Sequence, residues 1–220
     1  MSKAKAVIFD AYGTLFDVNS AAEKCKNQIG DKWEGFANYW RTTQLEYTWL
    51  RSLMKRHKDF WKVTEDSLDK SMKVFNINPN MREELLSLYK KLSTFPEVND
   101  TLKQLKNKNL KLAILSNGSP DLLNELVNSN NLTEIFDDLF SIEEVKIYKP
   151  DNKVYEIPIN KYKIKPEEIF FLSSNTWDVS GGGNYGYQSI WVNRNNNIFD
   201  NLDYKPKYEI KNLKQLLDII

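Results

Sequence analysis

The segment from residue 4 to residue 17 places the tightest constraint on the fold of this chain. Residues 4–9 form a short apolar run that predicts a buried strand. The strand ends at Asp10, and Gly13 follows in a turn that lets the backbone approach a ligand closely. A carboxylate in this place suits a nucleophile, although capping of the next segment explains Asp10 equally well when it is taken alone. The residue two positions later is Tyr12, where a phosphate-transferring site would want a second carboxylate.

A purely helical pattern occupies residues 18–95, with no strand signal to interrupt it. Apolar side chains recur at helical intervals over residues 33–54, and residues 60–75 repeat the pattern. Residues 81–92 form a third predicted helix, and Pro96 closes the block.

After Pro96 the pattern alternates between strands and helices. Strands are predicted over residues 111–115, 168–172 and 188–192, and helices over residues 100–105 (capped by Asp100), 121–127 and 213–219. Such alternation is typical of parallel strands joined by right-handed crossovers. We therefore expect an α/β fold: a Rossmann-like open parallel sheet core with an all-helical cap inserted after the first strand. The predicted domains are a catalytic core, residues 1–16 and 97–220, and a cap, residues 17–96.

Polar residues gather at three of the predicted strand ends: residues 10–14, Ser116 with Asn117, and residues 173–178. Ligands of open parallel sheets bind outside the carboxyl ends of the strands, so we expect a site here, beneath the cap. Ser116 and Asn117 offer a hydroxyl and an amide beside a helix start that favours an anion. An ordinary loop with helix-capping residues is the alternative for this pair.

Two further residues bear on Asp10. Thr14 is close enough in sequence to orient Asp10 by a hydrogen bond. Lys149 would supply a cation that favours the ionised carboxylate, although a surface lysine before a turn explains an isolated Lys-Pro pair more simply.

The third cluster offers groups that would handle a water molecule. Ser173 and Asn175 would position the water, and Asp178 would take its proton. Alternatively, Asp178 belongs to the first turn of a helix, where the helix dipole favours a carboxylate.

Charge and composition exclude several classes of protein. The chain has 31 Lys and Arg against 30 Asp and Glu, which gives no general attraction to nucleic acid or to an anionic membrane. No apolar run approaches the roughly 20 residues needed to cross a bilayer, and no signal-peptide pattern begins the chain, so we expect a cytoplasmic location. The single cysteine, Cys25, excludes an internal disulfide and a Cys-rich metal cluster, and we expect a free thiol on a helix.

With these residues assembled, the chain resembles the haloacid dehalogenase-like superfamily and, more narrowly, the L-2-haloacid dehalogenases. The wider pattern is, in chain order, Asp10 with Thr14, Ser116-Asn117, Lys149-Pro150-Asp151 and residues 173–178. The narrower one consists of FDAYGTL at residues 9–15, WRTTQLEYTWLR at 40–51, DFW at 59–61, YKPDNKVY at 148–155 and SSNTWD at 173–178. The resemblance covers essentially the whole chain, including the cap.

The resemblance implies a two-step hydrolysis that uses no cofactor and no metal. Asp10 would attack C2 of a short (S)-2-haloacid and expel halide, and water would then hydrolyse the aspartyl ester. Only the first step touches the stereocentre, so the product would be the (R)-2-hydroxyacid. The implied partners are a small 2-haloalkanoate, a halide ion and a second copy of the chain in a homodimer, with no nucleic acid and no membrane.

The resemblance also assigns residue roles. The implied catalytic set is Asp10, Thr14, Arg41, Ser116, Lys149, Tyr155, Ser173, Asn175 and Asp178, with Asp178 as the base. The implied substrate- and halide-binding set is Tyr12, Arg41, Leu45, Phe60, Ser116, Asn117 and Trp177. Arg41, with Asn117 and Trp177, would hold the halide, because a guanidinium beside aromatic walls stabilises a weakly hydrated anion. Ser116 and the main chain around Tyr12 would hold the substrate carboxylate.

Each assignment has a simpler alternative. Without the resemblance, Arg41 is expected to be a helix-surface arginine paired with a nearby Glu. The apolar residues of the second set, Tyr12, Leu45, Phe60 and Trp177, would simply be core.

Three other features lie outside this scheme. The only histidine, His57, sits in a basic stretch on a predicted helix, where a solvated face is expected. Pro158 is expected to end or kink the helix that starts near Lys153. The run Gly181-Gly182-Gly183 is expected to make the helix after Asp178 unusually flexible.

Two other functions remain open at this point. A Mg²⁺-dependent phosphatase of the same superfamily would want several carboxylates around the metal, whereas Asp10 and Asp178 alone make a poor site. A non-catalytic binding protein that kept the fold is the second alternative, since fold does not determine function. The intact set of Asp10, Arg41, Lys149 and Asp178 argues against it.

Overall fold

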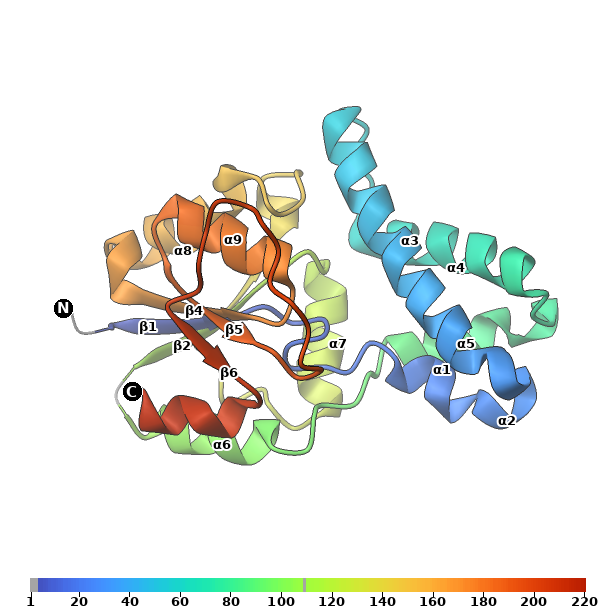
Figure 1. Ribbon diagram of the computed structural model, residues 1–220, viewed down its shortest axis with the longest axis horizontal. Helices are drawn as coiled ribbons and strands as arrows, with labels where there is room; N and C mark the ends of the chain where they lie inside the picture. The colour runs from blue at the N-terminus through green and yellow to red at the C-terminus, as the bar shows by residue number, and fades with distance from the viewer. Residues whose placement is uncertain (1–3, 109) are drawn as a thin grey trace.

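A six-stranded parallel sheet forms the centre of the molecule (Figure 1). The computed structural model describes residues 4–108 and 110–220. The strands, in chain order, are β1 (Ala6–Phe9), β2 (Lys111–Ser116), β3 (Asp138–Ser141), β4 (Ile169–Ser173), β5 (Gln188–Val192) and β6 (Tyr208–Ile210). Their order across the sheet is β3-β2-β1-β4-β5-β6, and every neighbouring pair is parallel. The predicted α/β fold is confirmed.

The position of β1 explains why Asp10 lies at the centre of the sheet edge. β1 pairs with β2 on one side and β4 on the other, with Phe9 opposite Ile114 and Leu172. All four of its residues are buried, as expected for a parallel strand covered on both faces. The three polar clusters therefore emerge from three adjacent strands at one edge.

Helices cover both faces of the sheet. They are α6 (Val98–Lys106), α7 (Pro120–Ser129), α8 (Asn152–Tyr162), α9 (Thr176–Tyr185) and a closing 3₁₀ helix, η5 (Leu213–Asp218). In Figure 1, α8 and α9 lie together over one face, while α6 and η5 pack against each other beneath the other. Shorter 3₁₀ turns, named η1 to η4, complete the list: Gly30–Lys32, Pro79–Met81, Ile142–Glu144 and Pro166–Glu168.

Five helices between β1 and β2 stand apart from the sheet as a cap (Figure 1). They are α1 (Ser20–Lys24), α2 (Lys26–Ile29), α3 (Trp33–Leu53), α4 (Phe60–Phe75) and α5 (Arg82–Tyr89), and α3 packs along α4. The two connecting segments pair through backbone bonds, Asp17 N to Ser93 O at 2.8 Å and Phe95 N to Leu15 O at 3.1 Å. We propose that the cap extends over residues 17–96, since α6 already packs against β2.

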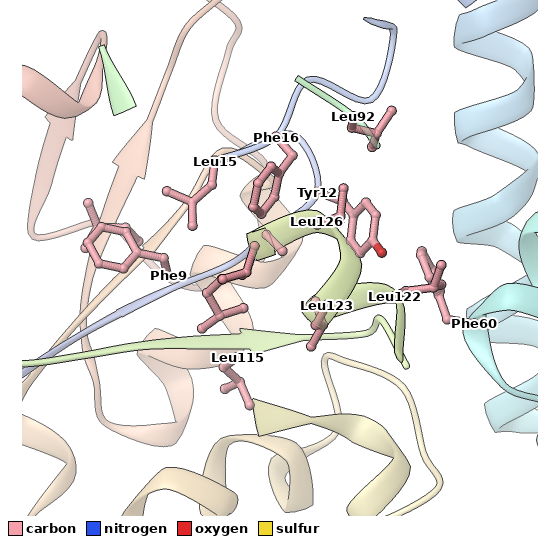
Figure 2. Close-up of a cluster of buried hydrophobic side chains, with 14 of the residues drawn as sticks. Phe9, Tyr12, Leu15, Phe16, Phe60, Leu92, Leu115, Leu122, Leu123 and Leu126 are labelled. Atoms are coloured by element: carbon pink, nitrogen blue, oxygen red, sulfur yellow. The ribbon is translucent and has the colours of Figure 1, made fainter. Parts of the chain in front are cut away.

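The carboxyl end of β1 leads into an apolar cluster that joins the two parts of the molecule (Figure 2). In this view the Tyr12 ring lies on the side of the cluster that faces Leu122 of α7 and Phe60 of the cap. Leu15, Phe16 and Leu92, from the connecting segments, are also buried here. The loop after Asp10 is therefore fixed by apolar packing on its far side.

The far end of the cap makes a second contact with the core. Tyr148 N donates to Ser52 Oγ at 3.1 Å, and Tyr148 Oη donates to Lys58 O at 2.6 Å. His57 Nε2 lies 3.0 Å from Glu143, and its ring is 5.4 Å from that of Tyr148. The predicted solvated helix face for His57 is wrong, because α3 ends at Leu53 and the following turn packs onto the core.

Other local predictions also differ from the structure. α6 begins at Val98, so Asp100 lies inside its first turn and does not cap it. Cys25 is a free thiol, but it is buried at the junction of α1 and α2. Strands β3 and β6 were not predicted, since each is short and lies at an edge of the sheet. In the described part of the chain, no helix is long and apolar enough to cross a membrane; a cytoplasmic location stays a prediction.

Pro158 does not end its helix, and the three glycines that follow Asp178 are closely packed. Pro158 lies inside α8, which continues to Tyr162. Gly181-Gly182-Gly183 lie inside α9, pressed against large side chains. A Cβ at Gly181 would come within 2.5 Å of Tyr155 Oη and 2.7 Å of Pro150 Cβ, and one at Gly182 within 2.7 Å of the Phe171 ring. These glycines therefore allow close helix packing.

We predict that Gly181→Ala destabilises the fold by about 1–3 kcal/mol, because the added methyl overpacks the space filled by Tyr155 and Pro150. Chemical denaturation measures the change. Asn184→Ala is the control, since Asn184 is exposed on the same helix. An unfolding free energy unchanged in Gly181→Ala would mean that the helix has room to move.

Candidate active site

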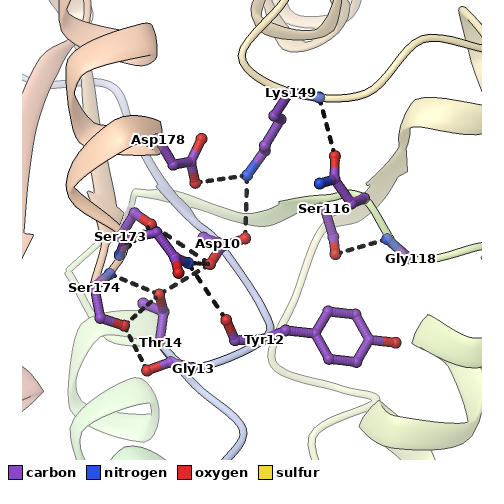
Figure 3. Close-up of polar contacts among 12 residues, drawn as sticks. Asp10, Tyr12, Gly13, Thr14, Ser116, Gly118, Lys149, Ser173, Ser174 and Asp178 are labelled. Carbon is purple, nitrogen blue, oxygen red and sulfur yellow. Dashed lines mark hydrogen bonds and ion pairs between the residues drawn. The ribbon is translucent and has the colours of Figure 1, made fainter. Parts of the chain in front are cut away.

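Both oxygens of the Asp10 carboxylate are held, and the two sets of partners differ (Figure 3). Oδ2 accepts hydrogen bonds from Thr14 Oγ1 at 3.1 Å and Asn175 Nδ2 at 2.9 Å, with Ser173 Oγ at 3.5 Å. Oδ1 accepts from Lys149 Nζ at 3.1 Å. Asp10 itself is only 5% exposed. The carboxylate is thus fixed in orientation, with Oδ1 the less encumbered oxygen.

The Thr14 hydroxyl is aimed at Asp10 by the loop after β4. Ser174 N donates to Thr14 Oγ1 at 2.9 Å, so the hydroxyl hydrogen is free to point to Asp10. Ser174 Oγ also bonds the carbonyl of Gly13. Gly13 has φ +90°, a conformation that favours glycine. Ser174 was not among the predicted site residues, and only its place beside Ser173 and Asn175 hinted at a role.

Lys149 lies between two carboxylates. Its ammonium is 3.1 Å from Asp10 Oδ1 and 2.9 Å from Asp178 Oδ2, and its side chain is fully buried. Burial by itself lowers the pKa of Lys149, but the two carboxylates outweigh burial and hold the pKa above its usual value. Lys149 is therefore no surface lysine before a turn.

Asp178 is buried at the start of α9, where Tyr155 Oη donates to its Oδ1 at 2.8 Å. Burial raises the pKa of Asp178 to about 6; Asp10 adds to this effect, and Lys149 opposes it. Burial, and then the charge of Asp178, raises the pKa of Tyr155 well above its usual value, so this hydroxyl keeps its proton and donates. A carboxyl poised near neutrality suits proton transfer.

Ser116 and Asn117 lie beside this group without touching Asp10. Ser116 Oγ accepts from Gly118 N at 3.0 Å, and Asn117 Oδ1 accepts from Lys149 N at 3.1 Å. Ser116 is fully buried. Asn117 therefore helps to fix the backbone of Lys149, which the sequence did not suggest.

Arg41 reaches the site from the cap. Its Nη2 donates to Tyr12 O at 3.2 Å, and its Nη1 donates to Gln44 Oε1 at 2.9 Å. Within residues 4–108 and 110–220, no carboxylate lies within salt-bridge distance of Arg41. The simpler expectation, an arginine paired with a nearby Glu, is wrong.

Aromatic rings of the core and the cap are in contact at two places. The Tyr12 ring is 4.9 Å from Phe60 and 5.8 Å from Tyr89, nearly parallel to the latter. Trp177, at the start of α9, packs edge-on against Trp49 of α3 at 5.4 Å. Leu45 is half-buried on α3, and neither Leu45 nor Trp177 bonds to Asp10 in the described residues.

Gln44 and Tyr89 are two residues that sequence reasoning missed. Both are nearly fully buried within the cap and both are close to Arg41. A polar Gln on the apolar side of a helix, three positions after Arg41, was the available signal.

Comparisons with known proteins agree with this geometry. The chain matches the family described as haloacid dehalogenase-like hydrolase over residues 4–186. It is 39% identical to an (S)-2-haloacid dehalogenase of Pseudomonas sp. (strain YL), over 100% of this chain and 95% of that protein.

Solved structures agree as well. An L-2-haloacid dehalogenase from Xanthobacter autotrophicus with chloropropionic acid covalently bound has a TM-score of 0.91 and 31% identity, with 98% of each chain covered. A dehalogenase with an intermediate complex has a TM-score of 0.98 and 33% identity, covering 100% of this chain and 98% of that one.

We predict that Lys149→Met costs about 3–5 kcal/mol of stability at pH 8, because it leaves two buried carboxylates without their cation. A carboxyl whose folded pKa is raised contributes stability that is present below its unfolded pKa and lost as pH rises through the folded value. Lys149 lowers the pKa of Asp178, so in the variant this pKa lies above the wild-type value of about 6. Protonation of Asp178 therefore relieves the defect, and the cost shrinks toward pH 5.

Denaturant unfolding of both proteins at pH 8 and pH 5 measures this change. Lys153→Met is the control, since Lys153 is exposed on the first turn of α8, and we expect it to change stability by about 0.5 kcal/mol or less. An equal cost for the two variants would contradict the assigned role of Lys149.

Proposed function

The chain belongs to the haloacid dehalogenase-like hydrolase family, and we propose how its residues divide the hydrolysis of (S)-2-haloacids through a covalent intermediate. The observation that carries the proposal is the Asp10 carboxylate, buried at a strand end and fixed on both oxygens beneath Arg41 of the cap. Asp10 is the nucleophile in this scheme, and 2-hydroxyacid and halide are the products.

In the first step Asp10 Oδ1 attacks C2 of the substrate from the side opposite the halogen. The new bond joins Oδ1 to C2, and the carbon–halogen bond breaks with its electron pair on the halide. Oδ1 is favoured over Oδ2 because it has one hydrogen-bond donor against three. A backside displacement inverts the centre, so an (S)-2-haloacid gives an (R)-2-hydroxyacid.

Arg41 receives the departing halide, assisted by Asn117 and Trp177. The guanidinium has no carboxylate partner among the described residues, so its charge is available to an anion. The Trp49–Trp177 pair brings an aromatic wall from α9 to α3. A preorganised cation in a partly buried site stabilises charge as it develops.

The substrate carboxylate is held at the turn after Asp10. In the described part of the chain, the backbone N–H groups of Ala11 and Tyr12 have no hydrogen-bond acceptor. With the buried hydroxyl of Ser116 they form a set of donors suited to a carboxylate. Tyr12, Leu45, Phe60 and Trp177 provide the apolar wall around the alkyl group, which favours short substrates.

In the second step a water attacks the carboxyl carbon of the ester. Asp178 takes the proton of this water, since its pKa of about 6 leaves it as a base at neutral pH. The charge of the tetrahedral intermediate falls on Oδ2, where Thr14, Asn175 and Ser173 donate. Collapse breaks the bond between the carboxyl carbon and the ester oxygen, and this oxygen takes up the proton held by Asp178. The hydroxyacid leaves, and Asp10 is restored as a carboxylate when it releases the remaining proton of the water to solvent.

The phosphatase alternative is disfavoured by the chemistry of the donor set. Residue 12 is Tyr, and Ser173 to Asn175 bring no carboxylate to the site. Asp10 and Asp178 share Lys149 between them, and Mg²⁺ prefers a cluster of oxygen ligands that usually includes several carboxylates. Independence from metal stays a prediction.

Halide release from (S)- and (R)-2-chloropropionate in the presence of EDTA tests the proposal. We expect release from the S form alone, with (R)-lactate as product, and a loss of at least about 10³-fold in Asp10→Asn because the nucleophile is gone. Asp151→Asn is the control, since Asp151 is a helix cap outside the site. Phosphate release from a phosphoester with Mg²⁺, and no halide from either enantiomer, would contradict the proposal.

We also propose a homodimer formed through the end of α3. Leu53 is 80% exposed and Met54 60%, with Leu50 beside them on α3, and such side chains are typical of an interface. We expect about twice the 25.8 kDa chain mass by light scattering, and a shift toward one chain mass in Leu53→Glu. Val74→Glu, at an exposed apolar position of α4, is the control. A wild-type protein at one chain mass contradicts the proposal.

A further inference from the structure

Gln44 of α3 bonds Arg41 on its own helix and one residue on each of two other cap helices, α4 and α5. Its side chain is only 1% exposed. Nε2 donates to Thr64 Oγ1 of α4 at 2.7 Å and to Tyr89 Oη of α5 at 2.9 Å. Oε1 accepts from Arg41 Nη1 at 2.9 Å and from Tyr89 Oη at 3.2 Å. Both ends of the amide are therefore used: Nε2 anchors the side chain, and Oε1 bonds both Arg41 and the anchoring Tyr89.

The orientation of this amide is dictated by α4. Thr64 Oγ1 donates its single hydrogen to Phe60 O at 2.8 Å, so toward Gln44 it can only accept. The NH₂ group of Gln44 must face Thr64, and the carbonyl oxygen must face Arg41. A buried amide turned the other way would set its NH₂ group against the guanidinium, donor to donor.

Among the residues that the structure describes, Arg41 is held by neutral oxygens alone. Its two acceptors are the amide oxygen of Gln44 and the backbone carbonyl of Tyr12. A carboxylate in either place would fix the guanidinium as firmly, but it would also neutralise the charge. A neutral acceptor fixes the geometry and leaves the full positive charge for an anion on the other side.

We infer that Gln44, anchored by Thr64 and Tyr89, is a positioning residue that aims Arg41 at the departing halide through an uncharged contact. The inference rests on the proposed function, in which Arg41 receives the halide. The charge is needed while the carbon–halogen bond breaks. Chloride is a poorer leaving group than bromide, so the step with chloride depends more on Arg41.

The test compares Gln44→Glu and Gln44→Met with the wild type in single-turnover halide release from (S)-2-chloropropionate and (S)-2-bromopropionate. Gln44→Glu keeps the shape and neutralises Arg41, so we expect about a 10²-fold loss with the chloro substrate and a smaller loss with the bromo substrate. Gln44→Met removes the contact without adding charge, so its loss is smaller. Thermal unfolding is measured for each variant.

Ser71→Ala is the matched control. Ser71 is equally buried in the cap, and its hydroxyl bonds the carbonyl of Ser67 within α4. We expect its halide-release rates, and their bromo-to-chloro ratio, to stay at wild-type values even if its thermal stability falls.

The inference is overturned if a variant loses the same factor in halide-release rate with both substrates and if this loss parallels its loss of thermal stability. Gln44 would then be a packing residue. If Gln44→Glu does not fold, Tyr89→Phe tests the inference in its place. This variant removes one hydroxyl that anchors Gln44. We then expect the ratio of the halide-release rates, bromo to chloro substrate, to rise by about two- to tenfold. An unchanged ratio there overturns the inference. Failure of the proposed function is seen separately, as a wild-type protein that releases no halide from either substrate.

Discussion

The Lys149 ammonium lies in a solvent-free position between Asp10 and Asp178, 3.1 and 2.9 Å from their carboxylates. Removing each of these charges from water costs several kcal/mol, and only their mutual contacts offset that cost. The loop that carries Lys149, the end of β1 and the start of α9 must therefore keep their relative positions. Asn117 and Tyr155 add hydrogen bonds to the same arrangement, so the three strand ends act as one rigid unit.

The site is divided between the core and the cap. The nucleophile, the lysine and the base come from the sheet edge, whereas Arg41 comes from α3 of the cap. The Arg41 contact with the Tyr12 carbonyl, and the Tyr12 ring against Phe60 and Tyr89, join the halves directly at the reacting centre. If the cap moved away from the core, Arg41 would no longer be near the departing halide, and Asp10 would have to displace the halide without that cation.

Much of the fold followed from sequence patterns, and the failures share a cause. The ranges of α4 and β5 were predicted to the residue, because a long amphipathic helix carries a strong periodic signal and a mostly buried strand is a short apolar run. The helix does not end at Pro158, as local propensity allowed, and local propensity also took no account of what packs against Gly181-Gly182-Gly183. Tyr155, Phe171 and Tyr204 fill the space that side chains at these glycines would need. Tertiary packing overrode the intrinsic preference.

The amino-acid sequence alone determined which residues stand at the carboxyl ends of the strands. Asp10, Ser116 and Ser173 converge there because parallel strands present those ends at one edge. Only the tertiary structure decided which groups face each other across elements. Lys149 is set between two carboxylates that lie 139 and 29 residues away along the chain, and Arg41 is held by neutral oxygens where a Glu partner was expected. Periodicity reports which face of an element is buried, but the partner of a buried group depends on how distant elements pack.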